Sequence, residues 1–125
     1  SDADRKAAAQ IEAAFKSGGL KPPGPHEVVN GTTEKLYRWL IRDGVLVAAK
    51  TDARGQSTQG IVFHRDAVAE AKTLLERAFP GGQPFTASDA RTALDTSRKY
   101  VIPLLELLDR EHFTRRNGDT RTLAR

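Results

Sequence analysis

Apolar residues recur with helical spacing in the first half of the chain and then give way to two short β-rich runs. Ile11, Ala14 and Phe15, for example, would form one stripe on a helix that the glycine pair at 18–19 ends. The polar stretch 50–59 between the β-rich runs predicts a flexible hairpin loop. The pattern predicts these elements in order: a helix over 4–17, a helical turn over 26–30, a helix that begins at Thr32 or Thr33 and ends at Asp43–Gly44, and strands over 45–49 and 60–64.

The second half repeats this order of elements. Its pattern predicts, in order, a helix over 65–79, an extended piece at 85–86, a short helix over 87–94, a helix from Thr96 or Ser97 to about Arg110, and a hairpin over 113–123. Asn117–Gly118 between two Thr- and Arg-rich runs is the strongest short hairpin signal in the chain.

The two halves also align directly at an offset of 68 residues, where Leu36 matches Leu104 and the segment 40–45 matches 108–113. We therefore predict two copies of one unit, over residues 1–64 and 65–125. Three helices followed by a β-hairpin is the order of a winged helix. The fold class that we predict is mainly α with small β-hairpin wings, as two tandem winged-helix domains. A generic α+β domain without a role in nucleic-acid binding is the alternative.

Composition excludes several classes of protein. The chain of 125 residues has no cysteine, so it has no disulfide framework, thiolate zinc site or cysteine nucleophile. No apolar run reaches the roughly 18 residues of a membrane span, and we expect no membrane contact. Methionine is absent even from position 1, which favours a processed product or a fragment of a larger protein. The formal net charge of +4 permits a polyanionic partner without requiring one.

The start of the predicted helix over 97–110 carries candidate chemistry. Arg98 and Lys99 stand in its first turn, where the helix dipole and unpaired N–H groups disfavour positive charge. The arrangement suits a phosphate, on which the N–H groups, the Ser97 hydroxyl and the two cations would converge. The alternative is that Ser97 is only a cap and both cations are ordinary solvated residues.

The predicted hairpin adds a second basic group. Arg115, Arg116 and Arg121 flank the turn at Asn117. Strand alternation places Arg115 and Arg116 on opposite faces, one toward the helix and one outward. Arginine suits bidentate contact with phosphate or guanine and stacks on unpaired bases. We therefore predict one composite anion-binding surface made of the helix start and the wing.

Other candidates are weaker. No convergent catalytic set, metal site or Walker A motif is visible, so we predict neither an enzyme nor an autonomous P-loop GTPase. We expect Trp39 in the core, and we read the basic face of Lys35, Arg38 and Arg42 as ordinary solvated surface. Pro103 is expected to break the hydrogen bond to the Lys99 carbonyl and bend its helix.

Four stretches of the second half carry a family resemblance: Thr96–Glu106, Leu108–Arg110, Phe113–Arg116 and Gly118–Arg121. Together they resemble the last winged-helix domain of the bacterial selenocysteine-specific elongation factors, the SelB family. The specific match spans about residues 95–123, and the tandem layout extends it over the chain as the last two of four C-terminal winged helices. The family usually has Gly where this chain has His112, a residue that tolerates the left-handed conformation less well than Gly.

The resemblance implies a cytoplasmic translation factor whose final winged helix grips an mRNA hairpin beside a UGA codon. Ser97, Arg98 and Lys99 would hold loop phosphates, while Arg115, Arg116 and Arg121 would reach phosphates and an unpaired base. The candidate RNA-binding residues are Ser97, Arg98, Lys99, Arg115, Arg116, Asn117 and Arg121. The resemblance further implies no cofactor in this segment, a monomer, and contacts with the ribosome and tRNA through the full-length factor.

Two other functions remain open from sequence. A DNA-binding tandem winged helix would carry cations along the exposed middle of its third helix. Val101, Ile102 and Glu106 occupy that stretch here, which argues against DNA. A protein-interaction scaffold is the other alternative, since winged helices serve several functions.

Overall fold

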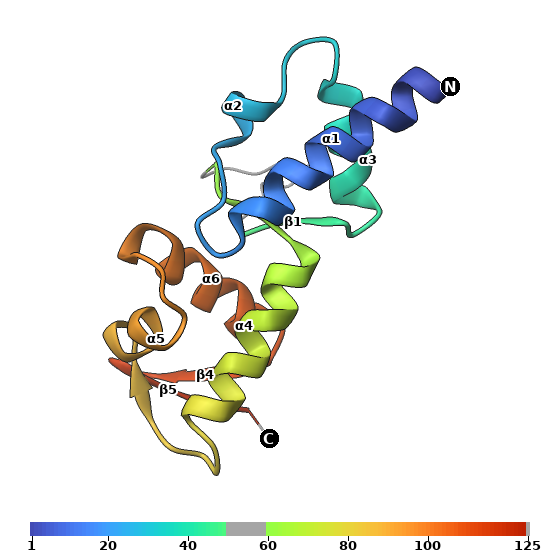
Figure 1. Ribbon diagram of the computed structural model, residues 1–125. Helices are drawn as coiled ribbons and strands as arrows, with labels where there is room; N and C mark the ends of the chain where they lie inside the picture. Colours follow the sequence, from blue (N-terminus) through green and yellow to red (C-terminus); the bar gives the residue numbers. More distant parts are fainter. Residues whose placement is uncertain (50–59, 125) are drawn as a thin grey trace. The chain divides into compact units, whose positions relative to one another are not determined.

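The computed structural model describes residues 1–49 and 60–124 (Figure 1). The predicted loop over residues 50–59 lies outside the described residues. The chain divides into two compact units, Ser1–Ala67 and Val68–Arg125.

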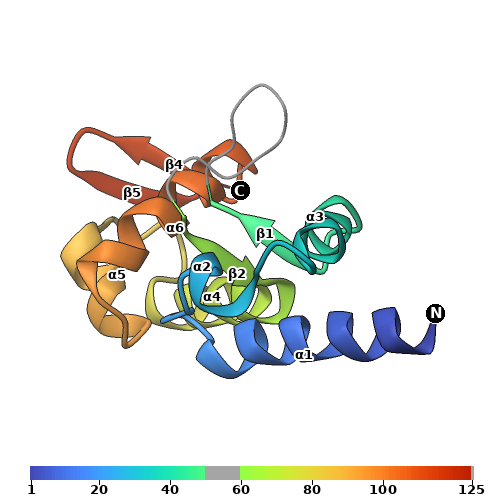
Figure 2. The ribbon, with the colours of Figure 1, turned by 90° about the horizontal axis from the view of Figure 1, so that it is seen from above.

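The first unit contains three helices followed by a two-stranded antiparallel sheet, as predicted (Figures 1 and 2). The elements are α1 (Asp2–Gly18), α2 (Pro25–Val28), α3 (Glu34–Arg42), β1 (Leu46–Ala48) and β2 (Val62–His64). Ser1 caps α1 by accepting a hydrogen bond from the Asp4 N–H. The two strands pair with Val47 opposite Phe63.

The core of the first unit lies between α1, α3 and the sheet. Phe15 of α1 is fully buried and stacks on Tyr37 of α3, with ring centroids 6.2 Å apart. Trp39, which we expected in the core, is instead 40% exposed, with the Lys35 ammonium 5.4 Å from its ring centroid. The reason is that α3 turns Leu36 and Tyr37 inward, so the face that carries Lys35 and Trp39 looks outward.

The second unit repeats the plan with one more strand. Its elements are α4 (Arg65–Ala78, whose first turn belongs to the first unit), β3 (Phe85–Thr86), α5 (Ala87–Ala93), α6 (Arg98–Arg110), β4 (Thr114–Asn117) and β5 (Thr120–Leu123). The antiparallel sheet has the order β3-β5-β4. A reciprocal capping box between Thr86 and Asp89 begins α5.

The core of the second unit is built on α6. Its inward face buries six side chains: Val101, Pro103, Leu104, Leu105, Leu107 and Leu108. Pro103 lies inside a helix that continues from Arg98 to Arg110, so the expected loss of one hydrogen bond does not end it. Phe85 of β3 completes the core and stacks on Phe79, with centroids 4.5 Å apart.

The internal repeat is visible in backbone hydrogen bonds at the offset of 68 residues. Gly44 donates to Ile41 at 3.1 Å, and His112 donates to Asp109 at 3.0 Å. The next bond repeats as well, since Val45 donates to Leu40 at 3.0 Å and Phe113 donates to Leu108 at 2.9 Å. Gly44 and His112, which donate the first of these bonds in each unit, have a left-handed backbone, with φ of +79° and +61°. Both wings therefore leave their third helix through the same turn, and His112 adopts the left-handed conformation that Gly44 takes in the first unit.

Candidate nucleic-acid interface

At the start of α6, the Ser97 hydroxyl and the first backbone N–H groups have no hydrogen-bond acceptor within the helix. Ser97 occupies the N-cap with extended backbone, but its hydroxyl makes no capping hydrogen bond. Its carbonyl accepts from Tyr100 and Val101, at 3.1 and 2.9 Å, so the amides of Arg98 and Lys99 precede the first intrahelical bonds. A hydroxyl and two backbone N–H groups are thereby available to an anion.

Both cations predicted for this site are exposed. Among the described residues, no carboxylate pairs with Arg98 or Lys99. The Lys99 ammonium lies 5.3 Å from the centroid of the Tyr100 ring, which is a cation–π distance. The first turn of α6 holds no acidic residue, whereas the first turns of the other described helices each hold one or more. The charged side chains of this first turn are therefore all cationic.

The wing presents a second group of cations. Strands β4 and β5 pair Arg115 with Thr122 and Asn117 with Thr120. The turn is thus Gly118–Asp119 rather than Asn117–Gly118, and Gly118 supplies the positive φ of +63° that its first position requires. Arg115 and Asn117 are exposed on the strand that leads into this turn.

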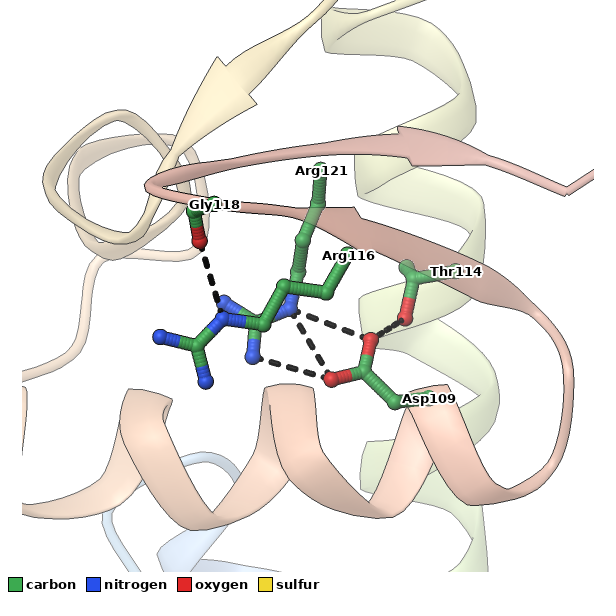
Figure 3. Close-up of polar contacts among 5 residues, drawn as sticks. All are labelled: Asp109, Thr114, Arg116, Gly118 and Arg121. Atoms are coloured by element: carbon green, nitrogen blue, oxygen red, sulfur yellow. Dashed lines mark hydrogen bonds and ion pairs between the residues drawn. The ribbon is translucent and has the colours of Figure 1, made fainter.

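Arg116 and Arg115 point to opposite sides of the hairpin, as strand alternation predicts. Arg116 shares its side with its cross-strand partner Arg121, beside α6 (Figure 3). Its Nε donates to the Gly118 carbonyl at 3.0 Å, which steadies a side chain that is exposed as a whole. No carboxylate of the described ranges pairs with either Arg115 or Arg116.

Arg121 does not occupy the position that we predicted for it. It is 5% exposed, and its guanidinium grips Asp109 near the end of α6 (Figure 3). Nε lies 3.0 and 3.1 Å from the two carboxylate oxygens, and Nη2 lies 2.9 Å from Oδ2. The predicted contact of Arg121 with RNA is not prepared in this structure, because its fork is already filled by the half-buried carboxylate of Asp109.

Sequence reasoning missed Asp109 and Thr114, which complete this cluster. Thr114 is 3% exposed, and its hydroxyl donates to Asp109 Oδ1 at 2.6 Å. Asp109 and Arg121 are twelve residues apart, so no helical or cross-strand spacing within the sequence marks them as partners. The available signal was the alternation that places Thr114, Arg116 and Arg121 on one face of the hairpin.

The hairpin lies along α6 and so brings its turn toward the helix start. In Figure 3 the strands run back from Asp109, and the turn at Gly118 lies over the part of α6 that precedes Asp109. The turn and Arg116 therefore lie beside α6, whereas Arg115 projects from the other side of the hairpin.

Neither a metal site nor a membrane-spanning helix occurs in the described part of the chain. Within residues 1–49 and 60–124, no group of three His, Asp or Glu side chains could hold a metal ion. No helix in these ranges is long and apolar enough to cross a membrane.

Comparison with known proteins agrees with the winged-helix fold. The sequence profile of the family described as "Elongation factor SelB, winged helix" matches residues 77–123. The selenocysteine-specific elongation factor of Desulfomicrobium baculatum is 28% identical over 121 residues, which are 92% of this chain and 18% of that protein. The chain thus spans less than a fifth of this relative.

Two solved structures share the fold of the whole chain. The bacterial selenocysteine-specific elongation factor EF-Sec matches 99% of this chain and 19% of its own, with a TM-score of 0.74 and 20% identity. The mRNA-binding domain of elongation factor SelB from E. coli, solved in complex with SECIS RNA, matches 98% of this chain and 97% of its own, with a TM-score of 0.71 and 22% identity. Residues 77–123 thus match the SelB winged-helix family, and 92% of the chain is similar to part of a selenocysteine-specific elongation factor.

Proposed function

We propose that this chain binds an mRNA stem-loop of the SECIS type as part of a selenocysteine-specific elongation factor. The observation that carries the proposal is the start of α6, where Arg98 and Lys99 stand unpaired beside an open cap in a helix whose first turn has no acid. The similar mRNA-binding domain of E. coli SelB, whose structure is in complex with SECIS RNA, supports the choice of RNA.

The geometry suits a loop better than a duplex. A-form RNA has a deep, narrow major groove that a helix cannot enter, so sequence-specific proteins read loops, bulges and ends. A helix start binds phosphate through N–H groups and cations, and Arg115 and Arg116 add planar forks that pair with phosphate or stack on an unpaired base. We propose that Ser97, Arg98 and Lys99 hold loop phosphates, and that the wing residues Arg115, Arg116 and Asn117 contact the remaining loop.

DNA reading through the major groove receives no support from α6. The middle of a groove-reading helix carries exposed polar side chains. In α6, Val101 is buried, and Ile102 and Glu106 are half-buried. No cation of α6 lies between Lys99 and Arg110.

The remaining expectations concern the full-length factor. We propose that this segment is a cytoplasmic, monomeric binding module without a catalytic role of its own. Contacts with the ribosome and with tRNA would come through the full-length protein, of which the segment spans 18% in the D. baculatum relative.

A binding comparison tests the proposed function. The probes are a SECIS-type hairpin, the same stem with its loop replaced, and a duplex DNA of equal length, each titrated at several salt concentrations. We expect a preference for the native loop that persists as salt rises, because loop contacts add to the salt-sensitive phosphate contacts. Equal binding to all three probes that salt abolishes would contradict the proposal and indicate only a generic basic surface.

A further inference from the structure

One carboxylate at the end of α6 ties both strands of the wing to the helix. Asp109 accepts from Thr114 at the start of β4 and from Arg121 in β5 (Figure 3). Thr114 and Arg121 are nearly inaccessible, at 3% and 5% exposure. Charge-assisted hydrogen bonds of this kind are short and directional, so they fix an orientation as well as a distance.

The first unit shows that the fold does not require this ionic cluster. At the offset of 68 residues, Ile41 stands for Asp109 and Leu46 stands for Thr114. Val62 stands for Arg121, because it pairs with Ala48 as Arg121 pairs with Arg116. Leu46 and Val62 are buried, and the helix-to-wing hydrogen bonds are the same in both units. Apolar packing therefore suffices to hold a wing on its third helix.

An ion pair with a buried arginine is weak evidence for stability, because the cost of removing charge from water offsets the attraction between the two groups. Its directionality is the property that apolar packing lacks. The pair lies directly beside the interface, since Arg121 is the cross-strand neighbour of Arg116. The cluster thus fixes the backbone from which Arg115 and Arg116 project.

We propose that Asp109 is a positioning residue for RNA recognition: through Arg121 and Thr114 it sets the wing on α6 so that Arg115 and Arg116 meet the loop. This inference rests on the proposed function. Asp109 itself touches no RNA in this account, and Arg121 acts through the wing rather than by contact.

A rival explanation is that Arg121 leaves Asp109 and binds RNA directly. The two explanations differ in what Asp109→Asn does. If Asp109 positions the wing, the substitution lowers the preference for the native loop. If Asp109 merely holds Arg121 back, the substitution releases a cation and preserves or strengthens loop binding.

The test compares three substitutions in the complete chain: Asp109→Asn, Arg121→Lys and Thr114→Val. Arg121→Lys keeps the charge but loses the fork, and Arg77→Lys at an exposed position of α4 is its matched control. The measured quantity is the ratio of affinities for the SECIS-type hairpin and for the same stem with its loop replaced. Because both probes carry the same phosphate charge, this ratio cancels the general effect of the changed net charge.

We expect Asp109→Asn and Arg121→Lys to lower the ratio about tenfold, equivalent to one charge-assisted hydrogen bond. Thr114→Val, which leaves the ion pair in place, should lower it about threefold, in line with one neutral bond. The slope of affinity against salt for Arg121→Lys should stay at the wild-type value, because no phosphate contact is lost. Arg77→Lys should match the wild type throughout.

Wild-type ratios in Arg121→Lys and Thr114→Val would overturn the inference, as would stronger loop preference in Asp109→Asn. Circular dichroism of each variant identifies any that fails to fold. If Asp109→Asn is among them, Arg121→Lys and Thr114→Val decide the matter. A wild-type chain without loop preference would instead overturn the proposed function, and the inference with it.

Discussion

Removing both cations from the start of α6 should weaken RNA binding in a way that salt makes measurable. Four exposed cations line the proposed interface: Arg98, Lys99, Arg115 and Arg116. No carboxylate of the described residues pairs with any of them. If each cation neutralises one loop phosphate, a plot of the logarithm of the association constant against the logarithm of the salt concentration should have a slope of about −3. Between about 50 and 200 mM salt, that slope is a loss of roughly 60-fold in affinity.

The double variant Arg98→Ala/Lys99→Ala keeps two of these contacts. Its slope should be about −1.5, and its affinity should fall only roughly eightfold over the same salt range. Its free energy of unfolding should stay equal or rise by about 0.5 kcal/mol, because cations at a helix N-terminus oppose the helix dipole. Weaker binding without loss of stability separates a contact role from a structural one.

Fluorescence anisotropy of a labelled hairpin, titrated at four or more salt concentrations, measures both slopes. Arg77→Ala on α4 is the control, since it removes one exposed positive charge outside the helix start and the wing. A wild-type slope in the double variant, or an equal change in the control, would refute the assignment of phosphate contacts to this helix end.

Three further predictions concern the first unit. Nε2 of the buried His64 lies 2.7 Å from Glu12 Oε2 and loses this partner in Glu12→Ala. The substitution should therefore lower the free energy of unfolding of the first unit by about 1–3 kcal/mol in a urea titration, and unchanged stability would contradict this. Gly44→Ala should cost about 1 kcal/mol through its φ of +79°, although no atom crowds the new Cβ, and a neutral effect would argue against the left-handed turn. Burial, with a smaller contribution from Glu34, raises the pKa of Tyr37 from 10.0 to about 12. The stability that the neutral phenol contributes is complete below pH 10 and is lost as pH rises toward 12. The free energy of unfolding should fall by up to about 3 kcal/mol over this range. Denaturation followed by circular dichroism measures this loss, and Tyr37→Phe should abolish it.

Local rules made most of the fold predictable from sequence. Helix boundaries followed from apolar spacing and caps, and the hairpins followed from short β-rich runs with glycines at their ends. The offset of 68 residues predicted equivalent turns, and Gly44 and His112 both take the left-handed backbone. A repeat of this kind is readable because each copy meets the same steric requirement at the same place.

The features that sequence could not give depend on contacts between distant residues. The pairing of Arg121 with Asp109 arises only when β5 folds back over α6, and no sequence periodicity relates the two positions. Trp39 was misplaced for a similar reason. A small unit has room for few large rings, and α3 buries Tyr37 against Phe15, which leaves Trp39 on the outer face.

The most direct test of the account is to map where a stem-loop touches the chain. Amide chemical shifts of the isotope-labelled protein, recorded as a SECIS-type hairpin is added, report this residue by residue. We expect the largest changes at residues 97–100 and 115–118, and no change on the exposed face of α3 around Trp39. Changes centred on α3, or spread evenly over every basic residue, would contradict an interface made of the α6 start and the wing.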